Sequence, residues 1–316
     1  MSEPLVSILI PTYNQAEFVR ETILSAVGQH YGNLEVVVAD DASQDGTAEI
    51  LRQLASEHPG RLIPVYGDVN LGVSGNFNRG LQRCRGEFVA FQGGDDVLLP
   101  DKVSRQVAFL LANDECALCY HNVDVFDSES GATIYLWSKR YGSRRGDVRS
   151  LVRYGPTICA TSVMARRKDL PAGGCDLRIR VGSDWLLFIQ ILAASGGTIG
   201  YLDEVLARYR RHRHNVTSAW DWKLEDQLLT LSLVESSWPH MLTAARRRRA
   251  DLFATAAVRH AAAGRYTAAA RFFAEAWLQS FPNPFAWLRL VWREAAFLAR
   301  QRGRPDDLMR GFLAKK

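Results

Sequence analysis

The sequence predicts an α/β domain with a mostly parallel sheet flanked by helices, followed by a helical C-terminal extension. Over roughly the first two thirds of the chain, short apolar, β-branched runs alternate with segments of helical period, a pattern typical of βαβ units. After about residue 220, alanine, arginine and tryptophan dominate and only helical patterns remain. We therefore expect two domains, residues 1–219 and residues 220–316.

The composition indicates an ordinary globular protein. Its 316 residues are 47% hydrophobic and 23% charged, so disorder is not expected. No run approaches the ~18 apolar residues of a membrane span, and the start lacks the basic region of a secretory signal. The five cysteines, an odd and scattered set, indicate reduced thiols. We expect a cytoplasmic protein, with the inner face of the cell membrane as an alternative location.

The first four strands come from apolar, β-branched runs that end at turn residues. They are expected at residues 5–10, 34–39, 61–66 and 87–91. Apolar residues at helical spacing predict helices at residues 15–29, 44–56, 73–84 and 101–113. Asn14 is expected to cap the first of these helices, and Pro100-Asp101 to start the last.

The next part of the chain has less regular patterns. Further strands are expected at residues 117–126, 133–137, 158–164 and 205–211. Cys116 and Cys119 have the spacing of half a zinc site, but they lie in an apolar run without a partner pair, which favours a buried strand. A mobile loop at 138–153 leads into a short helix, and residues 184–194 predict an apolar helix. The C-terminal helices are expected at 221–237, 240–263, 265–280 and 284–301.

Two acidic pairs follow neighbouring strands. Asp40-Asp41 ends the second strand, and Asp95-Asp96 lies just past the fourth, so both pairs are expected at the sheet edge where α/β proteins bind ligands. Like charges this close need a cation or hydrogen-bond donors, although helix capping is an alternative role. Hard divalent cations prefer carboxylate and phosphate oxygens. We therefore predict a cation between Asp95 and a diphosphate, and a base or ribose contact at Asp41.

The glycine-rich stretch between the two pairs excludes some classes of nucleotide-binding protein. Asn70, Gly72, Ser74 and Gly75 form a turn, but the lysine of a phosphate-binding P-loop is missing and the spacing is not GxGxxG. Kinase and dehydrogenase functions are therefore disfavoured.

Several motifs together resemble an inverting, bacterial-type family 2 glycosyltransferase of the GT-A fold. The resemblance covers about residues 4–215 and is carried by VSILIPTYN at 6–14, VVADDASQDGT at 37–47, NLG at 70–72, NRG at 78–80, GEF at 86–88 and GDD at 94–96. It implies sugar transfer from a nucleotide diphosphate sugar, most commonly a UDP-sugar. The acceptor would be a hydroxyl group of a glycan or lipid-linked saccharide, in cell-surface polysaccharide synthesis.

Residue by residue, the resemblance implies a nucleotide pocket with Asp41 on the base. The implied pocket residues are Pro11, Thr12, Tyr13, Asn14, Asp40, Asp41, Asn70, Gly72, Asn78 and Asp95. It also implies Mn²⁺ or Mg²⁺ at Asp95, Asp96 and His212, with Arg210 on the diphosphate. Gly93 replaces the first aspartate of the family's Asp-x-Asp. Because one carboxylate is missing, the cation is expected to depend more on diphosphate and water.

The implied catalytic base is Asp184. Gly182-Ser183-Asp184-Trp185 is similar to the family's Glu-Asp-Trp segment, with Ser183 in place of the glutamate. A helix N-terminus favours a charged carboxylate, and helix capping is a compatible role. Residues 209–212, YRRH, resemble a Tyr-Arg-x-His segment, although a solvated basic run is the alternative for His212.

Other functions stay open at this point. Because of Gly93 and Ser183, the chain could be a non-catalytic nucleotide-sugar-binding or scaffold protein. A sugar nucleotidyltransferase is disfavoured because residues 6–14 lack its glycine-rich, basic signature. The basic, aromatic helices within 240–301 could form a peripheral membrane surface, but a packed extension or a homo-oligomer interface is the favoured interpretation. No nucleic-acid-binding module is recognisable.

Overall fold

The computed structural model describes residues 3–213, 215, 220–280, 291 and 295. The chain divides into two compact units, Met1–Thr230 and Leu231–Lys316. This division falls inside helix α8 (Trp220–Ser237). The domain boundary that the sequence suggests after residue 219 therefore stays a prediction.

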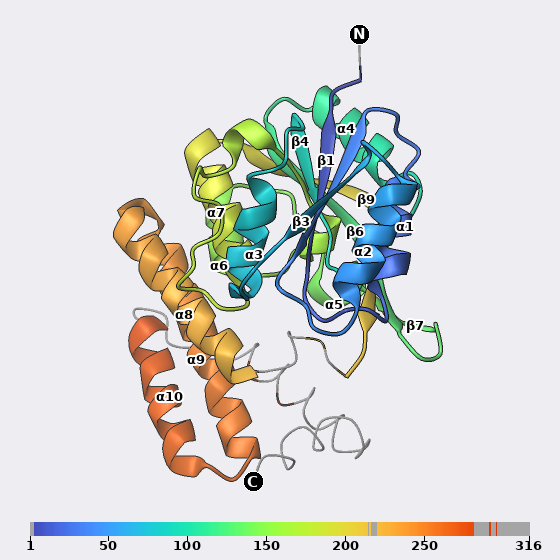
Figure 1. Cartoon of the computed structure of the whole chain (residues 1–316). Coiled ribbons are helices and arrows are strands. Elements are labelled where there is room, and N and C mark those ends of the chain that lie inside the picture. The colour runs from blue at the N-terminus through green and yellow to red at the C-terminus, as the bar shows by residue number, and fades with distance from the viewer. Residues whose placement is uncertain (1–2, 214, 216–219, 281–290, 292–294, 296–316) are drawn as a thin grey trace. The chain divides into compact units, whose positions relative to one another are not determined.

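The first unit is built on one nine-stranded, mixed sheet (Figure 1). Its strand order is β3-β2-β1-β4-β8-β6-β9-β5, and β7 pairs with β6. Four strands run parallel: β1 (Val6–Thr12), β2 (Leu34–Asp40), β3 (Leu62–Tyr66) and β4 (Phe88–Phe91). The long strands β6 (Cys116–Asp127) and β9 (Thr198–Arg211) also pair in parallel. The antiparallel members are β5 (Val97–Leu98), β7 (Thr133–Leu136) and β8 (Met164–Arg166).

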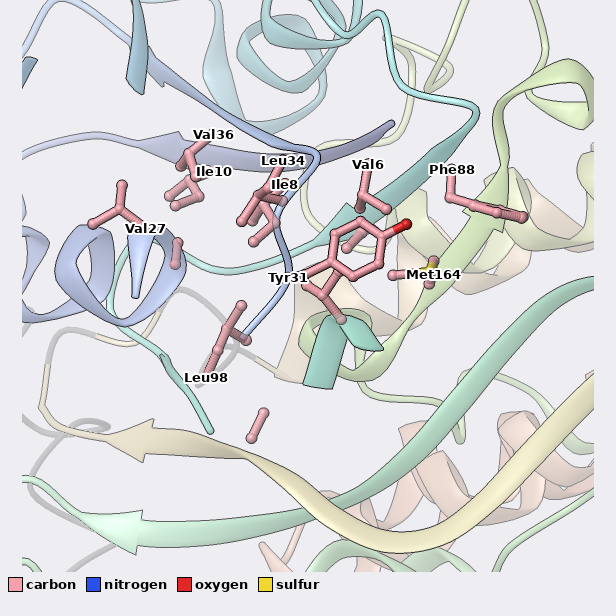
Figure 2. Close-up of a cluster of buried hydrophobic side chains, with 14 of the residues drawn as sticks. Val6, Ile8, Ile10, Val27, Tyr31, Leu34, Val36, Phe88, Leu98 and Met164 are labelled. Atoms are coloured by element: carbon pink, nitrogen blue, oxygen red, sulfur yellow. The ribbon is translucent and has the colours of Figure 1, made fainter. Parts of the chain in front are cut away.

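Alternate residues of the strands face two helical layers, because side chains on a strand alternate between its faces. Even-numbered residues of β1 and β2, with α1 (Val19–Val27), α2 (Thr47–Glu57) and α4 (Lys102–Ala112), form one buried cluster, shown in Figure 2. On the other face lie α3 (Gly72–Leu81) and α7 (Ser183–Ser195). There the ring of Phe91 lies 5.3 Å from Phe77 and 6.1 Å from Phe188. Each fully buried aliphatic or aromatic side chain contributes about 1.5–3 kcal/mol.

The predicted α/β class is confirmed, with local corrections at two places. The first helix begins at Val19 rather than at residue 15, so Asn14 does not cap it. Asn14 instead has a left-handed backbone (φ 50°), and its Oδ1 accepts a hydrogen bond from the Gln44 amide at 2.8 Å. The strand predicted at 158–164 is also wrong. A 3-10 turn, Ala160–Ser162, precedes β8, because the Ser162 hydroxyl donates to the Cys159 carbonyl and competes with strand pairing.

The cysteine prediction holds in the structure. Cys116 and Cys119 lie on β6, and all five cysteines are buried, free thiols. Two short helices, α5 (Trp137–Tyr141) and α6 (Val148–Tyr154), occupy the segment predicted as a loop and a short helix. The last strand of the domain, β9, starts at Thr198 and is longer than expected.

The second unit contains the end of α8, then α9 (Leu242–Ala262) and α10 (Tyr266–Ser280). Gly264 turns the chain between α9 and α10 with φ 74°, and Ala254 and Ala276 pack where these helices meet. The helix predicted at 284–301 lies outside the described residues. Within the part of the chain that the structure describes, no helix combines the length and hydropathy needed to span a membrane.

Candidate active site

The carboxyl ends of β1, β2 and β4 meet at one edge of the sheet, which is where the two acidic pairs lie. Thr12 pairs with Asp40 across β1 and β2, and the Gln92 amide, directly after β4, donates to Leu9 on β1. The Asn76 side chain ties β1 to β2 by donating to the carbonyls of Ala39 at 2.7 Å and Thr12 at 3.3 Å. The sequence thus correctly placed both acidic pairs at a single edge.

Asp41 is a buried carboxylate that fixes the glycine-rich turn. Its oxygens accept the amides of Leu71 at 2.8 Å and Gly72 at 2.9 Å, and the Arg79 guanidinium lies 3.3 Å away. Gly72 has φ 72°, a left-handed conformation that favours glycine. The Asn70 side chain accepts the same Gly72 amide at 3.0 Å. Asp41, Asn70 and Gly72 are therefore brought together as one wall at the sheet edge.

The other predicted pocket residues have different surroundings. Asp40 is buried and accepts hydrogen bonds from the Ser43 amide and hydroxyl, so it shapes its own turn. Thr12 is buried beside Pro11, whereas 47% of Tyr13 is exposed. Asn78 exchanges two hydrogen bonds with the backbone of Cys175, at 2.7 and 2.8 Å. Both ends of the Asn78 side chain are thus engaged in holding a loop, and its role in a nucleotide pocket stays a prediction.

Asp95 and His212 form the pair best suited to a cation. The His212 Nε2 atom lies 2.9 Å from Asp95 Oδ2, and Asn215 Nδ2 lies 3.3 Å from the same oxygen. Neighbouring ligands of an octahedral cation at about 2.1 Å are about 3 Å apart, so this pair fits Mn²⁺ or Mg²⁺. No cluster of three or more His, Cys, Asp or Glu side chains suited to a metal occurs among the described residues.

Asp96 differs sharply from its neighbour. Its Oδ1 accepts the Arg210 amide at 3.0 Å, and only 2% of the residue is exposed. Burial, reinforced by the Asp95 charge, raises the pKa of Asp96 well above its ordinary value. The hydrogen bond from the Arg210 amide joins Asp96 to β9, and its role as a metal ligand stays a prediction.

Gly93 lies against both carboxylates. A Cβ atom at this position would come within 2.9 Å of an Asp96 oxygen and 3.0 Å of an Asp95 oxygen. A side chain at position 93 would therefore require a small shift of these two carboxylates.

Arg210 is positioned by groups on three sides. Its Nε donates to the Asp95 carbonyl at 2.8 Å, and its guanidinium pairs with Glu21 and lies over the rings of Phe18 and Phe126. The residue is only 6% exposed. Its visible role is to join β9 to the Asp95 loop, and diphosphate contact stays a prediction.

Asp184 lies in the first turn of α7, as expected, and is partly buried. Burial raises the pKa of its carboxyl to about 6, while a hydrogen bond from the Trp185 amide at 2.9 Å acts in the opposite direction. A carboxyl with this pKa is ionised at neutral pH yet basic enough to accept a proton. Asp184 therefore has the properties of a general base.

Cys159 is a buried thiol that responds to three of the carboxyl groups. Burial raises the pKa of its thiol, and the charges of Asp96, Asp184 and Asp95 each raise it further. The predicted base on α7 and the two acids of the loop after β4 therefore lie within electrostatic range of the same side chain.

Sequence reasoning missed three residues that organise this site. Arg79 supports Asp41, Asn215 contacts Asp95, and Glu21 pairs with Arg210. Arg79 lies within the NRG motif at 78–80, which was a usable signal. Asn215 and Glu21 reach the site only through tertiary folding, and no local pattern marks them.

Comparisons with known proteins give one consistent result. The family model described as Glycosyl transferase family 2 matches residues 7–171. An uncharacterised protein of Mycobacterium tuberculosis is 35% identical over 217 residues, 67% of this chain and 60% of its own length. The chain thus spans three fifths of the length of this mycobacterial relative. A Bacillus subtilis protein named for teichuronic acid biosynthesis, TuaG, is 26% identical over 75% of this chain and 93% of its own.

Solved structures share the fold. Residues 1–349 of Staphylococcus aureus TarS in complex with UDP-GlcNAc align with a TM-score of 0.63 at 16% identity, over 96% of this chain and 93% of that one. The mannosyltransferase PcManGT of Pyrobaculum calidifontis, in complex with GDP-Man and Mn²⁺, aligns with a TM-score of 0.57 at 20% identity, over 97% and 89%. The predicted GT-A fold with a helical C-terminal part is thereby confirmed.

Proposed function

This chain belongs to glycosyl transferase family 2, and on that premise we propose that it transfers a sugar from a nucleotide diphosphate sugar to an acceptor hydroxyl group. The observation that supports the proposal is the placement of Asp184 in the first turn of α7, within electrostatic range of the same buried thiol, Cys159, as Asp95 and Asp96. A base near a cation site would provide for both ends of the reaction, proton removal from the acceptor and charge on the leaving diphosphate.

In this reaction Asp184 accepts the proton of the acceptor hydroxyl group. The freed oxygen attacks the anomeric carbon of the donor from the face opposite the nucleotide. The new carbon–oxygen bond forms as the bond to the diphosphate breaks, so the anomeric configuration inverts. The nucleoside diphosphate leaves with the bonding electron pair, and the proton stays on Asp184 until solvent removes it. The buried Asp41 at the sheet edge would serve the nucleotide of the donor, which a glycoside hydrolase does not need.

The cation is the proposed cofactor. Asp95 and His212 would hold Mn²⁺ or Mg²⁺, with the diphosphate and water as the remaining ligands, and Arg210 would add positive charge nearby. Bound there, a divalent cation neutralises charge on the departing diphosphate. Support comes from the 2.9 Å separation of the Asp95 and His212 atoms and from PcManGT, a family-fold neighbour in complex with Mn²⁺.

UDP is the proposed nucleotide, with Asp41 on the base and the predicted pocket residues around it. TarS, a neighbour of the same fold, is in complex with UDP-GlcNAc. We expect Asp41→Asn to weaken UDP binding about 10- to 100-fold, because an asparagine carries no charge to pair with Arg79 and has only one oxygen to accept from the two backbone amides of Leu71 and Gly72. Calorimetric titration with UDP and Mn²⁺ measures the effect. Asp68→Asn, an exposed change in the same loop, is the matched control. Equal UDP affinity in the two variants would show that Asp41 does not contribute to the nucleotide pocket.

The acceptor is proposed to be a glycan or a lipid-linked saccharide in cell-surface polysaccharide synthesis. The name of TuaG, a relative that this chain matches over 93% of its length, supports this class. Residues 240–301 would provide peripheral contact with the inner face of the cell membrane or a homo-oligomer interface. Arg249, the last of four consecutive arginines at 246–249, pairs with Glu235 at 2.8 Å within the second unit.

A two-stage experiment tests the proposal. Thermal shifts are measured with UDP, GDP and dTDP, with and without Mn²⁺, and then UDP release is measured from a panel of UDP-sugars with saccharide acceptors. We expect UDP with Mn²⁺ to give the largest shift, since saturation at ~100 times Kd stabilises by about 2.7 kcal/mol. No shift with any nucleotide refutes the proposal. Binding without turnover in the whole panel favours the non-catalytic alternative, and pyrophosphate release favours a nucleotidyltransferase.

A further inference from the structure

Asp226 is a buried carboxylate that the reaction does not use directly. It lies on the first half of α8, inside the first compact unit, and only 4% of it is exposed. Buried carboxylates usually have a specific partner, because removing an ion from water costs several kcal/mol. In this case the partners are backbone amides of the loop that leads into α7.

The contacts of Asp226 are concentrated on three consecutive residues. Its Oδ2 accepts the amides of Val181 at 2.8 Å and Gly182 at 3.1 Å, and its Oδ1 accepts the Arg180 amide at 3.3 Å. Asp226 itself is held in place, since Thr230 on the next helical turn donates to its carbonyl at 2.8 Å. The carboxylate therefore fixes the backbone immediately before Ser183 and Asp184.

The start of α7 has no side-chain cap of its own. Gly182, the residue that precedes α7, has no side chain, and no side-chain cap bond is made at this helix end. Asp226 instead accepts the amides of residues 180–182, directly before the helix. The backbone that leads into Asp184 therefore depends on a carboxylate of α8.

We propose that Asp226 is a positioning residue for the catalytic base, holding residues 180–182 so that Asp184 keeps its place in the first turn of α7. The inference rests on the proposed function of Asp184. A rigid approach matters because a misplacement of about 1 Å at a catalytic group can cost 100-fold in rate. Asp226 acts through the backbone and does not touch the substrate.

The adjacent residue provides a matched control. Glu225 carries the same charge on the same helix turn, but its ion pair is with the exposed Arg180 side chain, at 3.3 Å with both side chains more than 60% exposed. Glu225→Gln removes a charge equally near the loop without touching its backbone amides. Asp226→Asn removes the charge and keeps one acceptor oxygen, whereas Asp226→Ala removes all acceptors.

The first experiment measures steady-state sugar transfer by the full chain. We expect kcat to fall about 10-fold in Asp226→Asn and about 100-fold in Asp226→Ala, with the Kd for UDP unchanged and Glu225→Gln equal to wild type. The acidic limb of kcat should move from about pH 6 toward the ordinary aspartate value, because a loosened loop admits water to Asp184. The thiols of Cys159 and Cys175 also face Asp184, and both stay protonated across this pH range.

The second experiment does not depend on activity. Hydrogen exchange of the amides at 180–182 should speed up at least about 10-fold in Asp226→Asn relative to Glu225→Gln, at a temperature where both are folded. Unchanged exchange, or an unchanged acidic limb in an active Asp226→Asn variant, overturns the inference. A wild-type chain that transfers no sugar instead refutes the proposed function, and the exchange result then still decides whether Asp226 holds the loop.

Discussion

Asp184→Asn is expected to lower kcat by about 1,000-fold or more and to leave UDP affinity within about twofold of wild type. The amide keeps the size of the side chain and its place in the first turn of α7, but it cannot take a proton. Positioned general bases contribute about 100- to 10,000-fold to rate. Asp41, the proposed contact to the nucleobase, lies in the loop between β2 and α2. It makes its hydrogen bonds to a different loop from the one that holds Asp184, so the nucleotide pocket should survive the change.

The pH dependence of kcat provides an independent check on the same residue. Only the ionised form of a general base is active. Because the folded pKa of Asp184 is about 6, the rate should rise as pH increases through about 6 and then level off. In Asp184→Asn the residual rate should lack this limb. Asp114→Asn, at a carboxylate with 95% of its side chain exposed, is the control. Full activity in Asp184→Asn would assign the base to another group.

Lys102→Met is expected to stabilise the fold, most strongly at and below neutral pH. Lys102 is fully buried, and its ammonium group donates to Gln106 Oε1 at 2.8 Å. Burial lowers the pKa of Lys102 to about 7, against about 10.4 for an exposed lysine. Folding therefore has to desolvate the charged amine or deprotonate it, at a cost of a few kcal/mol. The hydrogen bond to Gln106, which Lys102→Met lacks, offsets part of this cost in the wild type.

The sign of the pH effect follows from proton linkage. Above about pH 7 the folded chain loses the Lys102 proton while the unfolded chain keeps it. Unfolding then takes up a proton, so the wild-type free energy of unfolding rises with pH. The advantage of Lys102→Met should shrink by about 2 kcal/mol between pH 6.5 and 8.5. Denaturant titrations under reducing conditions measure it, with Lys168→Met, an exposed change, as the control. Parallel pH curves for wild type and Lys102→Met would contradict the lowered pKa.

The sequence predicted those parts of the fold that short-range patterns determine. Period-2 and period-3.6 runs located β1 to β4 and the helices between them, and parallel strands necessarily bring Asp40-Asp41 and Asp95-Asp96 to one edge. The 3-10 turn Ala160–Ser162 was missed because it lies inside the largely apolar run 158–164, whose β-branched residues favour a strand. There a single side-chain hydrogen bond to the backbone decided the conformation.

The candidate site was predictable to the extent that strand ends define it. Asp184 and His212 came from a family resemblance, not from periodicity, and their environments came only from the structure. The contrast between Asp95 and Asp96 depends on which carboxyl is buried, and adjacent residues in a sequence carry no sign of that. The same holds for Asn215 and Asp226, whose hydrogen bonds to Asp95 and to residues 180–182 join segments far apart in the chain.

The proposed cation site has a thermodynamic consequence. With only Asp95 and His212 as the proposed protein ligands, water or diphosphate oxygens have to fill the remaining positions around the cation. If diphosphate replaces water there, the two should bind with positive cooperativity, and by reciprocity the factor by which Mn²⁺ tightens UDP must equal the factor by which UDP tightens Mn²⁺. Such a chain would hold its cation more tightly while a donor is bound than after the product has left.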